Sequence, residues 1–212
     1  EEASLFGLNR EKAVIIHPAV NPDYFYPTNQ PPTNDKPFTI VSTGSLIWRK
    51  GYEYALLAIR RLKDNGIPLH YQIIGKGPEE QRIRYTIHDL ELEQQVELVG
   101  QQPPEIVRKR LQEADVFLLS SLSEGIANAA LEAMACGIPV VTTDCGGMRE
   151  AITDGVEGLV TPLRHPEAMA QALQKLWQDP TLRQKMGENG RKRVLADFNF
   201  ANQVSQFLDL FQ

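Results

Sequence analysis

Short apolar runs alternate with longer stretches of helical periodicity along most of the chain, and this order restricts the fold more than any other feature. Six runs read as buried strands, over residues 38–44, 71–75, 96–99, 116–120, 138–142 and 158–161. Helices are expected between them, over 52–65, 79–90, 104–113, 128–135 and 148–152. Strands joined by helical crossovers lie parallel, and helices then cover both faces of the sheet. The pattern therefore predicts an α/β fold with a doubly wound parallel sheet.

The two ends of the chain depart from this alternation. Residues 12–17 form a short apolar run that reads as a strand, and 18–35 is rich in proline and asparagine, as linkers are. We therefore expect 1–37 to be the end of a preceding domain and an interdomain linker, and 38–212 to be one domain. The tail, 165–212, is expected to form two helices that pack back on the fold.

Composition and charge argue against several classes of function. The 212 residues are 42% hydrophobic, which is enough to bury a core, and the formal net charge of −5 argues against a nucleic-acid partner. The two cysteines are too few for a disulfide framework, and neither they nor the four histidines have the spacing of a metal site. With so few cysteines we expect a reducing, cytoplasmic compartment, and no apolar run is long enough to span a bilayer.

The segment after the fourth strand, 120–140, carries the most informative polar residues. Parallel doubly wound sheets bind ligands at the carboxyl ends of their strands, which is where this segment begins. Glu124 lies in the loop and Glu132 about one turn into the next helix, so that both can face one crevice. Since acids repel anions, Glu124 is expected to accept a hydrogen bond from a sugar hydroxyl and Glu132 from a ribose hydroxyl. Two glutamates in isolation would more often be solvated surface residues.

Between these glutamates, the start of the helix offers backbone N–H groups. Unpaired donors and the helix dipole at such a position favour an anion such as a diphosphate. The residues expected to present these amides are Gly125, Ile126, Ala127 and Asn128.

The loop after the first strand, 42–51, is the second candidate. Gly44 allows a tight turn with close approach of the backbone to a ligand. Lys50 can direct its ammonium group to a diphosphate oxygen. The sequence does not predict a hydrolase triad, because Ser120 and Ser121 lack the G-x-S-x-G pattern that presents a nucleophilic serine.

These motifs resemble the retaining glycosyltransferases of group 1, also called family 4. The spacing from Glu124 to Glu132 resembles the family's E-x7-E signature. Loop 42–51 resembles its G-R-x5-K-G motif, except that Ser45 stands where the arginine would be. One positive charge is therefore missing beside the expected diphosphate, and Arg49 or another group would have to compensate.

Two further strand ends join the candidate site through the same resemblance. Gly75 and Gly77 resemble the family's G-x-G-P loop near the donor nucleotide, although such turns are common by themselves. Residues 96–101 resemble the region whose backbone meets the nucleobase in relatives, which makes Val99 a candidate contact.

The resemblance implies the C-terminal half of a GT-B fold, a Rossmann-like domain that holds a nucleoside diphosphate sugar. It implies transfer of a hexosyl unit with retention of configuration, without a metal or another cofactor, in the synthesis of a bacterial polysaccharide or glycolipid. The implied catalytic residues are Glu124 and Lys50. The implied partner is an N-terminal acceptor domain, through which the enzyme could touch a membrane peripherally. Without that domain, this chain is expected to bind a donor and complete no transfer.

Two other functions stay open. A nucleotide-sugar epimerase of the same GT-B architecture would bind a similar donor but needs acid and base groups around the sugar ring, and the E-x7-E spacing argues against it. A noncatalytic nucleotide-binding module on a flavodoxin-like fold would explain Ser45 as lost chemistry. That module predicts donor binding that does not depend on Glu124, or none at all.

Overall fold

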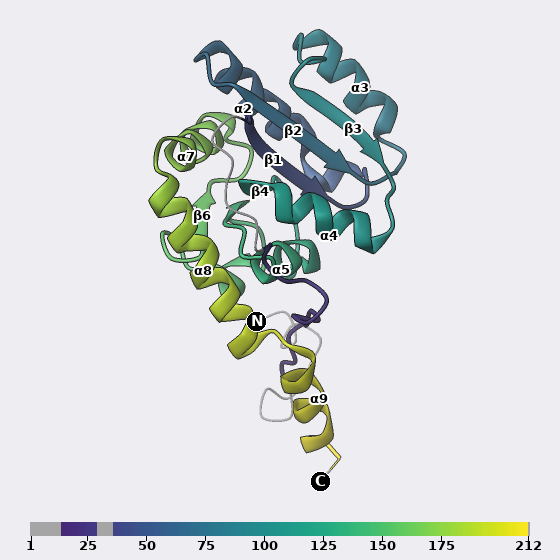
Figure 1. Cartoon of the computed structure of the whole chain (residues 1–212). Coiled ribbons are helices and arrows are strands. Elements are labelled where there is room, and N and C mark those ends of the chain that lie inside the picture. Colours follow the sequence, from purple (N-terminus) through teal and green to yellow (C-terminus); the bar gives the residue numbers. More distant parts are fainter. Residues whose placement is uncertain (1–13, 29–35, 212) are drawn as a thin grey trace.

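A six-stranded, fully parallel sheet forms the centre of the molecule in the computed structural model, which describes residues 14–28 and 36–211 (Figure 1). The strands are β1 (Phe38–Thr43), β2 (Leu69–Ile74), β3 (Val96–Gly100), β4 (Val116–Leu119), β5 (Val140–Thr143) and β6 (Gly158–Thr161). They lie in the order β3-β2-β1-β4-β5-β6. The chain thus winds outward in both directions from the β1/β4 pair, which confirms the predicted doubly wound sheet.

Helices cover both faces of the sheet. One face carries α2 (Tyr52–Asp64), α3 (Glu80–Asp89) and α7 (Pro166–Gln178). The other carries α4 (Pro104–Glu113), α5 (Asn128–Ala135), α6 (Met148–Ala151) and α8 (Pro180–Asp197). None of the helices in the described part of the chain combines the length and hydrophobicity that crossing a bilayer requires.

The strands are apolar throughout because successive side chains enter two different cores. In β1, Ile40 packs against α2 and its neighbours, whereas Val41 packs on the opposite face. In the neighbouring β4, Phe117 pairs with Val41 and lies on the same second face, whereas Leu118 lies on the first. This two-residue alternation, with both faces buried, explains the continuous apolar runs in the sequence.

Close backbone packing joins the loops at the carboxyl ends of β1, β2 and β3. Gly44 N–H donates to Ile74 O over 3.0 Å, and Gly75 N–H donates to Gly100 O over 2.9 Å. Gly75 has φ of +152°, and a Cβ atom there would lie 1.8 Å from Gly44 O. Only glycine lets these two loops meet.

Replacing Gly75 with alanine is expected to lower the free energy of unfolding by about 3 kcal/mol, through strained φ and the clash with Gly44. Urea denaturation measures this loss. Gly155→Ala is the matched control, because Gly155 has φ of +81° but no neighbouring atom within 4 Å of an added Cβ. The control should lose about 1 kcal/mol, the cost of the backbone conformation alone. Equal losses in the two variants would contradict the importance of the close approach.

The strand predicted over 12–17 is not formed by its described part. Residues 14–17 have no regular structure, Val14 and Ile15 are exposed, and Lys12 and Ala13 lie outside the described residues. None of the strands in the described residues pairs with this run. From residue 14 onward, the first β-type contact is instead a single bridge between Val20 and Asn199.

The segment that follows is anchored on the domain. Phe25 is buried in the core on the α5 side, and Arg191 in α8 donates to the carbonyl oxygens of Pro22, Phe25 and Ala135 over 2.8–3.0 Å. The sequence pattern predicts that Arg191 belongs to a solvated basic run, residues 191–193. In the fold its guanidinium group fastens residues 22–25 to the end of α5. The interdomain role predicted for 1–37 stays a prediction.

The tail forms three helices rather than the predicted two. Pro180 cannot continue α7 and begins α8, whose first turn is capped by Asp179. Asn199 in turn caps α9 (Phe200–Asp209). Gly187 lies inside α8 and allows this helix to pack closely on the loop after α5, where an added Cβ would stand 2.0 Å from Gly137 O.

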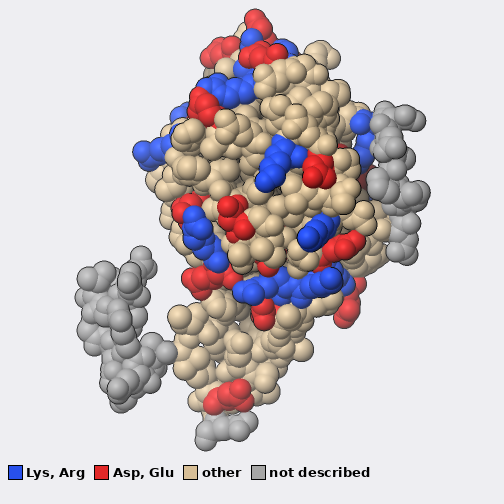
Figure 2. Space-filling model, turned by 90° about the vertical axis from the view of Figure 1, so that its left-hand side faces the viewer, with Lys and Arg blue, Asp and Glu red and all other residues tan. Residues whose placement is uncertain are grey.

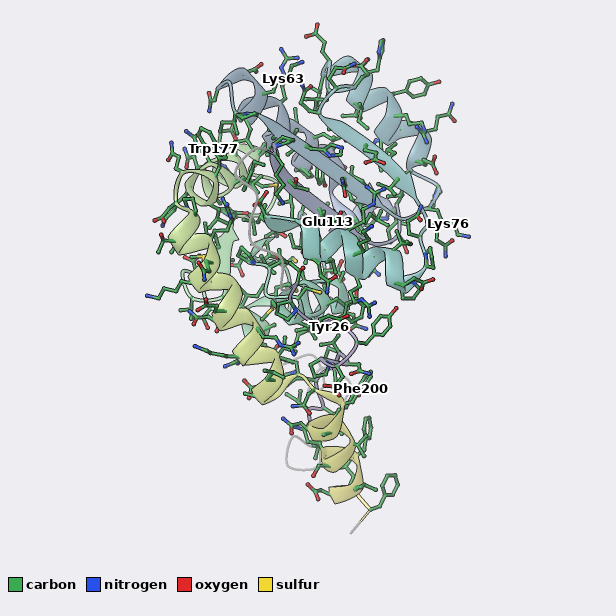
Figure 3. All side chains as sticks on the ribbon, viewed as in Figure 1. Tyr26, Lys63, Lys76, Glu113, Trp177 and Phe200 are labelled. Carbon is green, nitrogen blue, oxygen red and sulfur yellow. The ribbon has the colours of Figure 1, made fainter. Side chains whose placement is uncertain are left out.

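The tail packs back on the fold through α7 and α8, as predicted, but not through its last helix. Helix α9 extends away from the sheet and buries none of its residues (Figures 1 and 3). Its exposed apolar side chains are Phe200, Val204, Phe207 and Leu208. No described element offers these side chains an apolar surface to pack against.

Candidate functional site

Hydrogen bonds fasten the loop after β1 to the loop after β4. Ser120 Oγ donates to Lys50 O over 2.8 Å, and Leu122 N–H donates to Arg49 O over 2.7 Å. Gly51 has φ of +61° and packs against Ser120, whose carbonyl oxygen would lie 2.3 Å from an added Cβ. These contacts fix the backbone from which the Lys50 side chain projects.

Lys50 and Glu124, the two predicted catalytic residues, form an ion pair. Lys50 Nζ lies 2.6 Å from Glu124 Oε1, and the two side chains are only 14% and 10% exposed. Ser121 Oγ donates to the same oxygen over 2.8 Å. The sequence predicted that both residues lie at this edge but not that they bond to each other.

Two glycines and a tyrosine lie close to the ion pair. A Cβ atom on Gly44 would lie 3.7 Å from Lys50 Nζ and 3.8 Å from the hydroxyl of Tyr52. Tyr52 is buried, and burial together with the negative charge of Glu124 raises its pKa, so that the phenol stays protonated. On the other side, Gly146 touches the backbone of Glu124, with an added Cβ 1.7 Å from Glu124 O. Tyr52 and Gly146 were not among the predicted site residues.

The start of α5 matches the prediction in part. Gly125 and Asn128 are exposed, and the role of their amides and that of Ile126 stays a prediction. Ala127 differs, because it is buried and its N–H lies 3.3 Å from Met148 Sδ, to which it donates. The prediction that Ala127 presents a free amide to a ligand is therefore wrong. The approach of α6 to this helix start could not be read from the local pattern.

Glu132 lies one turn after Asn128, as predicted. No described residue pairs with its carboxyl group, and burial raises its pKa to about 7. An ionised carboxylate without a partner is costly in such a place. A ligand that donates hydrogen bonds to Glu132 would remove part of that cost.

The remaining predicted residues line the same edge. Gly77 packs on Leu46, whose carbonyl oxygen would lie 2.3 Å from a Cβ on Gly77, and Leu46 N–H donates to Lys76 O over 2.9 Å.

Val99 lies at an irregular point in the pairing of β2 with β3. Ile73 pairs with Leu98 and Ile74 with Gly100, so Val99 is skipped in the register. Its carbonyl oxygen accepts from Gln102 Nε2 over 3.1 Å. The skipped register leaves the Val99 amide outside the regular ladder.

Ser45 is exposed in the position where the family pattern has arginine. Two exposed cations lie in the neighbouring stretches of backbone, Arg49 four residues on and Lys76 in the loop hydrogen-bonded to Leu46 (Figure 3). Either can supply positive charge to a ligand at this edge.

The other end of the sheet holds a cavity of about 690 Å³, lined among others by Thr39, Asp115, Pro139 and Arg183. Thr39, Asp115 and Pro139 lie at or just before the starts of strands, whereas Arg183 lies in the first turns of α8. None of the predicted site residues lines this cavity. Asp115 there is already engaged by Thr39 N–H over 2.9 Å and by Arg183 over 3.4 Å. The predicted catalytic and binding residues therefore lie together at the carboxyl edge of the sheet and not at this cavity.

Within residues 14–28 and 36–211 no three His, Cys, Asp or Glu side chains form a group that could hold a metal ion.

Comparison with known proteins identifies the family. The family described as glycosyl transferases group 1 matches residues 28–193. The chain belongs to this family. It is 37% identical over 202 residues to WcaL of Escherichia coli, named as a candidate colanic acid biosynthesis glycosyltransferase, covering 91% of this chain and 49% of WcaL. It is 38% identical over 170 residues to the amylovoran biosynthesis glycosyltransferase AmsK of Erwinia amylovora, covering 77% of this chain and 42% of AmsK.

Solved structures share the fold of this group 1 chain. Sucrose-phosphate synthase from Thermosynechococcus elongatus superposes with a TM-score of 0.86 at 28% identity, covering 99% of this chain and 55% of the synthase. Anabaena HepE in complex with UDP superposes with a TM-score of 0.89 at 18% identity, covering 98% and 59%. The predicted half of a GT-B fold is confirmed. The chain spans about half the length of the curated relatives it matches.

Proposed function

We propose that this chain is the nucleotide-sugar-binding half of a retaining glycosyltransferase that transfers a hexosyl unit during synthesis of a bacterial polysaccharide or glycolipid. The observation that carries the proposal is the Lys50–Glu124 pair, 2.6 Å apart, at the carboxyl edge of the sheet. The names of WcaL and AmsK support a polysaccharide product, and the HepE complex with UDP makes uridine nucleotides the first donors to test. A cytoplasmic location belongs to the same proposal.

The proposed reaction breaks the bond between the anomeric carbon and the diphosphate and forms a bond from that carbon to the oxygen of an acceptor hydroxyl, whose proton passes to the departing diphosphate. Lys50 donates to the diphosphate and stabilises its charge as it leaves, aided by backbone amides at the start of α5. Glu124 accepts a hydrogen bond from a hydroxyl of the sugar. Positive side chains and backbone donors supply the stabilisation, so the proposal includes no metal and no other cofactor.

The nucleoside part of the donor is assigned to two neighbouring places. Glu132 in its ionised form accepts hydrogen bonds from ribose hydroxyls, which gives its carboxyl group the partners that no described residue provides. Backbone groups of Val99 and its neighbours meet the nucleobase. Gly75 and Gly77 allow the backbone to approach the nucleotide closely.

The other half of the enzyme, which holds the acceptor, is proposed to cover the apolar face of α9. Phe200, Val204, Phe207 and Leu208 follow the spacing of one helix face and are all exposed. Helix α9 contains no Lys or Arg, and it forms the nearly uncharged lobe at the bottom of Figure 2. A membrane-surface helix usually presents basic residues, so the composition of α9 favours a protein partner for this face.

Calorimetric titration of the chain with uridine, guanosine and adenosine diphosphate sugars tests the proposal. Saturable binding of donors with one base is expected, and Glu124→Ala should weaken the binding of the sugar nucleotide by about tenfold, the effect of one charged hydrogen bond. Binding that Glu124→Ala leaves unchanged would favour the noncatalytic module. If neither this chain nor the full-length enzyme bound any member of the panel, the proposed function would be overturned.

A further inference from the structure

Two consecutive serines at the end of β4 hold opposite members of the Lys50–Glu124 pair. Ser120 and Ser121 are only 3% and 0% exposed. Ser120 Oγ donates to the backbone oxygen of Lys50, and Ser121 Oγ donates to the carboxylate of Glu124, each over 2.8 Å. One short segment of the sheet therefore sets the position of both charged residues.

The bond from Ser121 orients the Glu124 carboxylate. Ser121 and Lys50 both reach Oε1, and no described residue donates to Oε2. A carboxylate accepts several hydrogen bonds, so fixing one oxygen leaves the other available to a ligand. Because the carboxylate is already held in one direction, binding such a ligand loses less side-chain freedom.

Ser121 is itself held from the next strand. Its carbonyl oxygen accepts a hydrogen bond from Thr143 Oγ1, and Thr143 at the end of β5 is buried. The hydroxyl of Ser121 thus occupies a rigid position at the sheet edge. Buried hydroxyls most often bond to backbone groups, whereas this one is directed to a charged side chain of the candidate site.

We propose that Ser121 is a positioning residue, which aims Glu124 Oε2 at a hydroxyl of the donor's sugar, while Ser120 holds the backbone of Lys50. The inference rests on the proposed function and deepens it. Through Glu124, Ser121 makes the site bind a nucleotide sugar more tightly than the same nucleotide without its sugar. Ser121 acts through Glu124 and touches no reacting atom.

Calorimetry of Ser121→Ala with UDP-glucose and with UDP, or with the matching pair for whichever base the wild type binds, tests this role. Affinity for the nucleotide sugar should fall about fivefold, less than in Glu124→Ala because Ser121 acts only through that carboxylate. Affinity for the nucleoside diphosphate should change by less than about twofold, because only the sugar meets Glu124. Ser123→Ala is the matched control. Ser123 is exposed in the same loop and its side chain bonds to no described residue, so both affinities should stay unchanged.

Three outcomes would overturn the inference. They are an unchanged affinity of Ser121→Ala for the nucleotide sugar, an equal loss of affinity for both ligands, and an effect of Ser121→Ala that persists undiminished in a Glu124→Ala background. If Ser121→Ala failed to fold, Ser121→Cys, which keeps a weaker donor, should show the same selective loss with a smaller size. If neither the wild-type chain nor the full-length enzyme bound a nucleotide of the panel, the proposed function and this inference would both be overturned, whereas the three outcomes above leave the proposed function standing.

Discussion

Replacing Lys50 with alanine is expected to lower the free energy of unfolding by about 3 kcal/mol, the cost of leaving a largely buried charge without its partner. Glu124 and Lys50 are 10% and 14% exposed, so water compensates only in part for the missing ammonium group. Removing both charges should cost less than removing one. The double variant Lys50→Ala, Glu124→Ala should therefore recover much of the stability that Lys50→Ala loses.

Urea denaturation of the two single variants and the double variant measures this coupling. Arg84→Ala is the control, because Arg84 pairs with Glu80 over 2.8 Å but the two side chains are 58% and 39% exposed. Exposed pairs contribute about 0–1 kcal/mol, and the control should lose no more than that. A loss in Lys50→Ala as small as in the control would mean that the Lys50–Glu124 pair does not hold the two loops together.

Glu132→Gln is expected to make the protein more stable at pH 8, by about 2–3 kcal/mol, and to change stability little at pH 4.5. Burial raises the pKa of Glu132 from 4.5 to about 7 in the fold. Between these two values the folded state keeps a proton that the unfolded state has lost, so stability falls as pH rises. The fall is complete above the folded pKa. Glutamine has the same shape and carries no charge to desolvate.

The same substitution should weaken donor binding, because glutamine is a poorer acceptor than a carboxylate for ribose hydroxyls. Urea denaturation at a series of pH values, together with calorimetry, measures both effects. Glu93→Gln provides a control of opposite sign. A hydrogen bond from its own backbone N–H and one from His88 lower the pKa of Glu93, so its ionised form stabilises the fold. A gain in stability for Glu132→Gln that did not depend on pH would contradict the assigned cause.

The periodicity of the sequence was sufficient to predict the sheet and its helices, because both faces of each strand are buried and the helices carry one apolar stripe. It also placed Lys50 and Glu124 at one edge, since loops after parallel strands must gather there. Their direct bond could not be predicted. It depends on Ser120 and Ser121, whose hydroxyls bond to residues 70 and three positions away.

The wrong predictions share a cause, which is that local pattern does not show what lies beside a segment. Residues 14–17 are apolar enough for a strand, but no strand within 14–28 and 36–211 pairs with them. The Ala127 amide stands at a helix start, yet the side chain of Met148 from α6 reaches it first. Helix α9 has an apolar face, but no described part of this chain covers it.

Amide NMR of the chain, with and without the nucleotide sugar that binds it, tests most directly where the donor lies. We predict that the resonances of Gly44, Gly75, Val99 and Gly125 shift on saturation, because these amides line the carboxyl edge of the sheet. Those of Thr39 and Asp115, beside the cavity at the other end, should not move. Shifts concentrated at Thr39 and Asp115, with the carboxyl edge unchanged, would contradict the placement of the donor site.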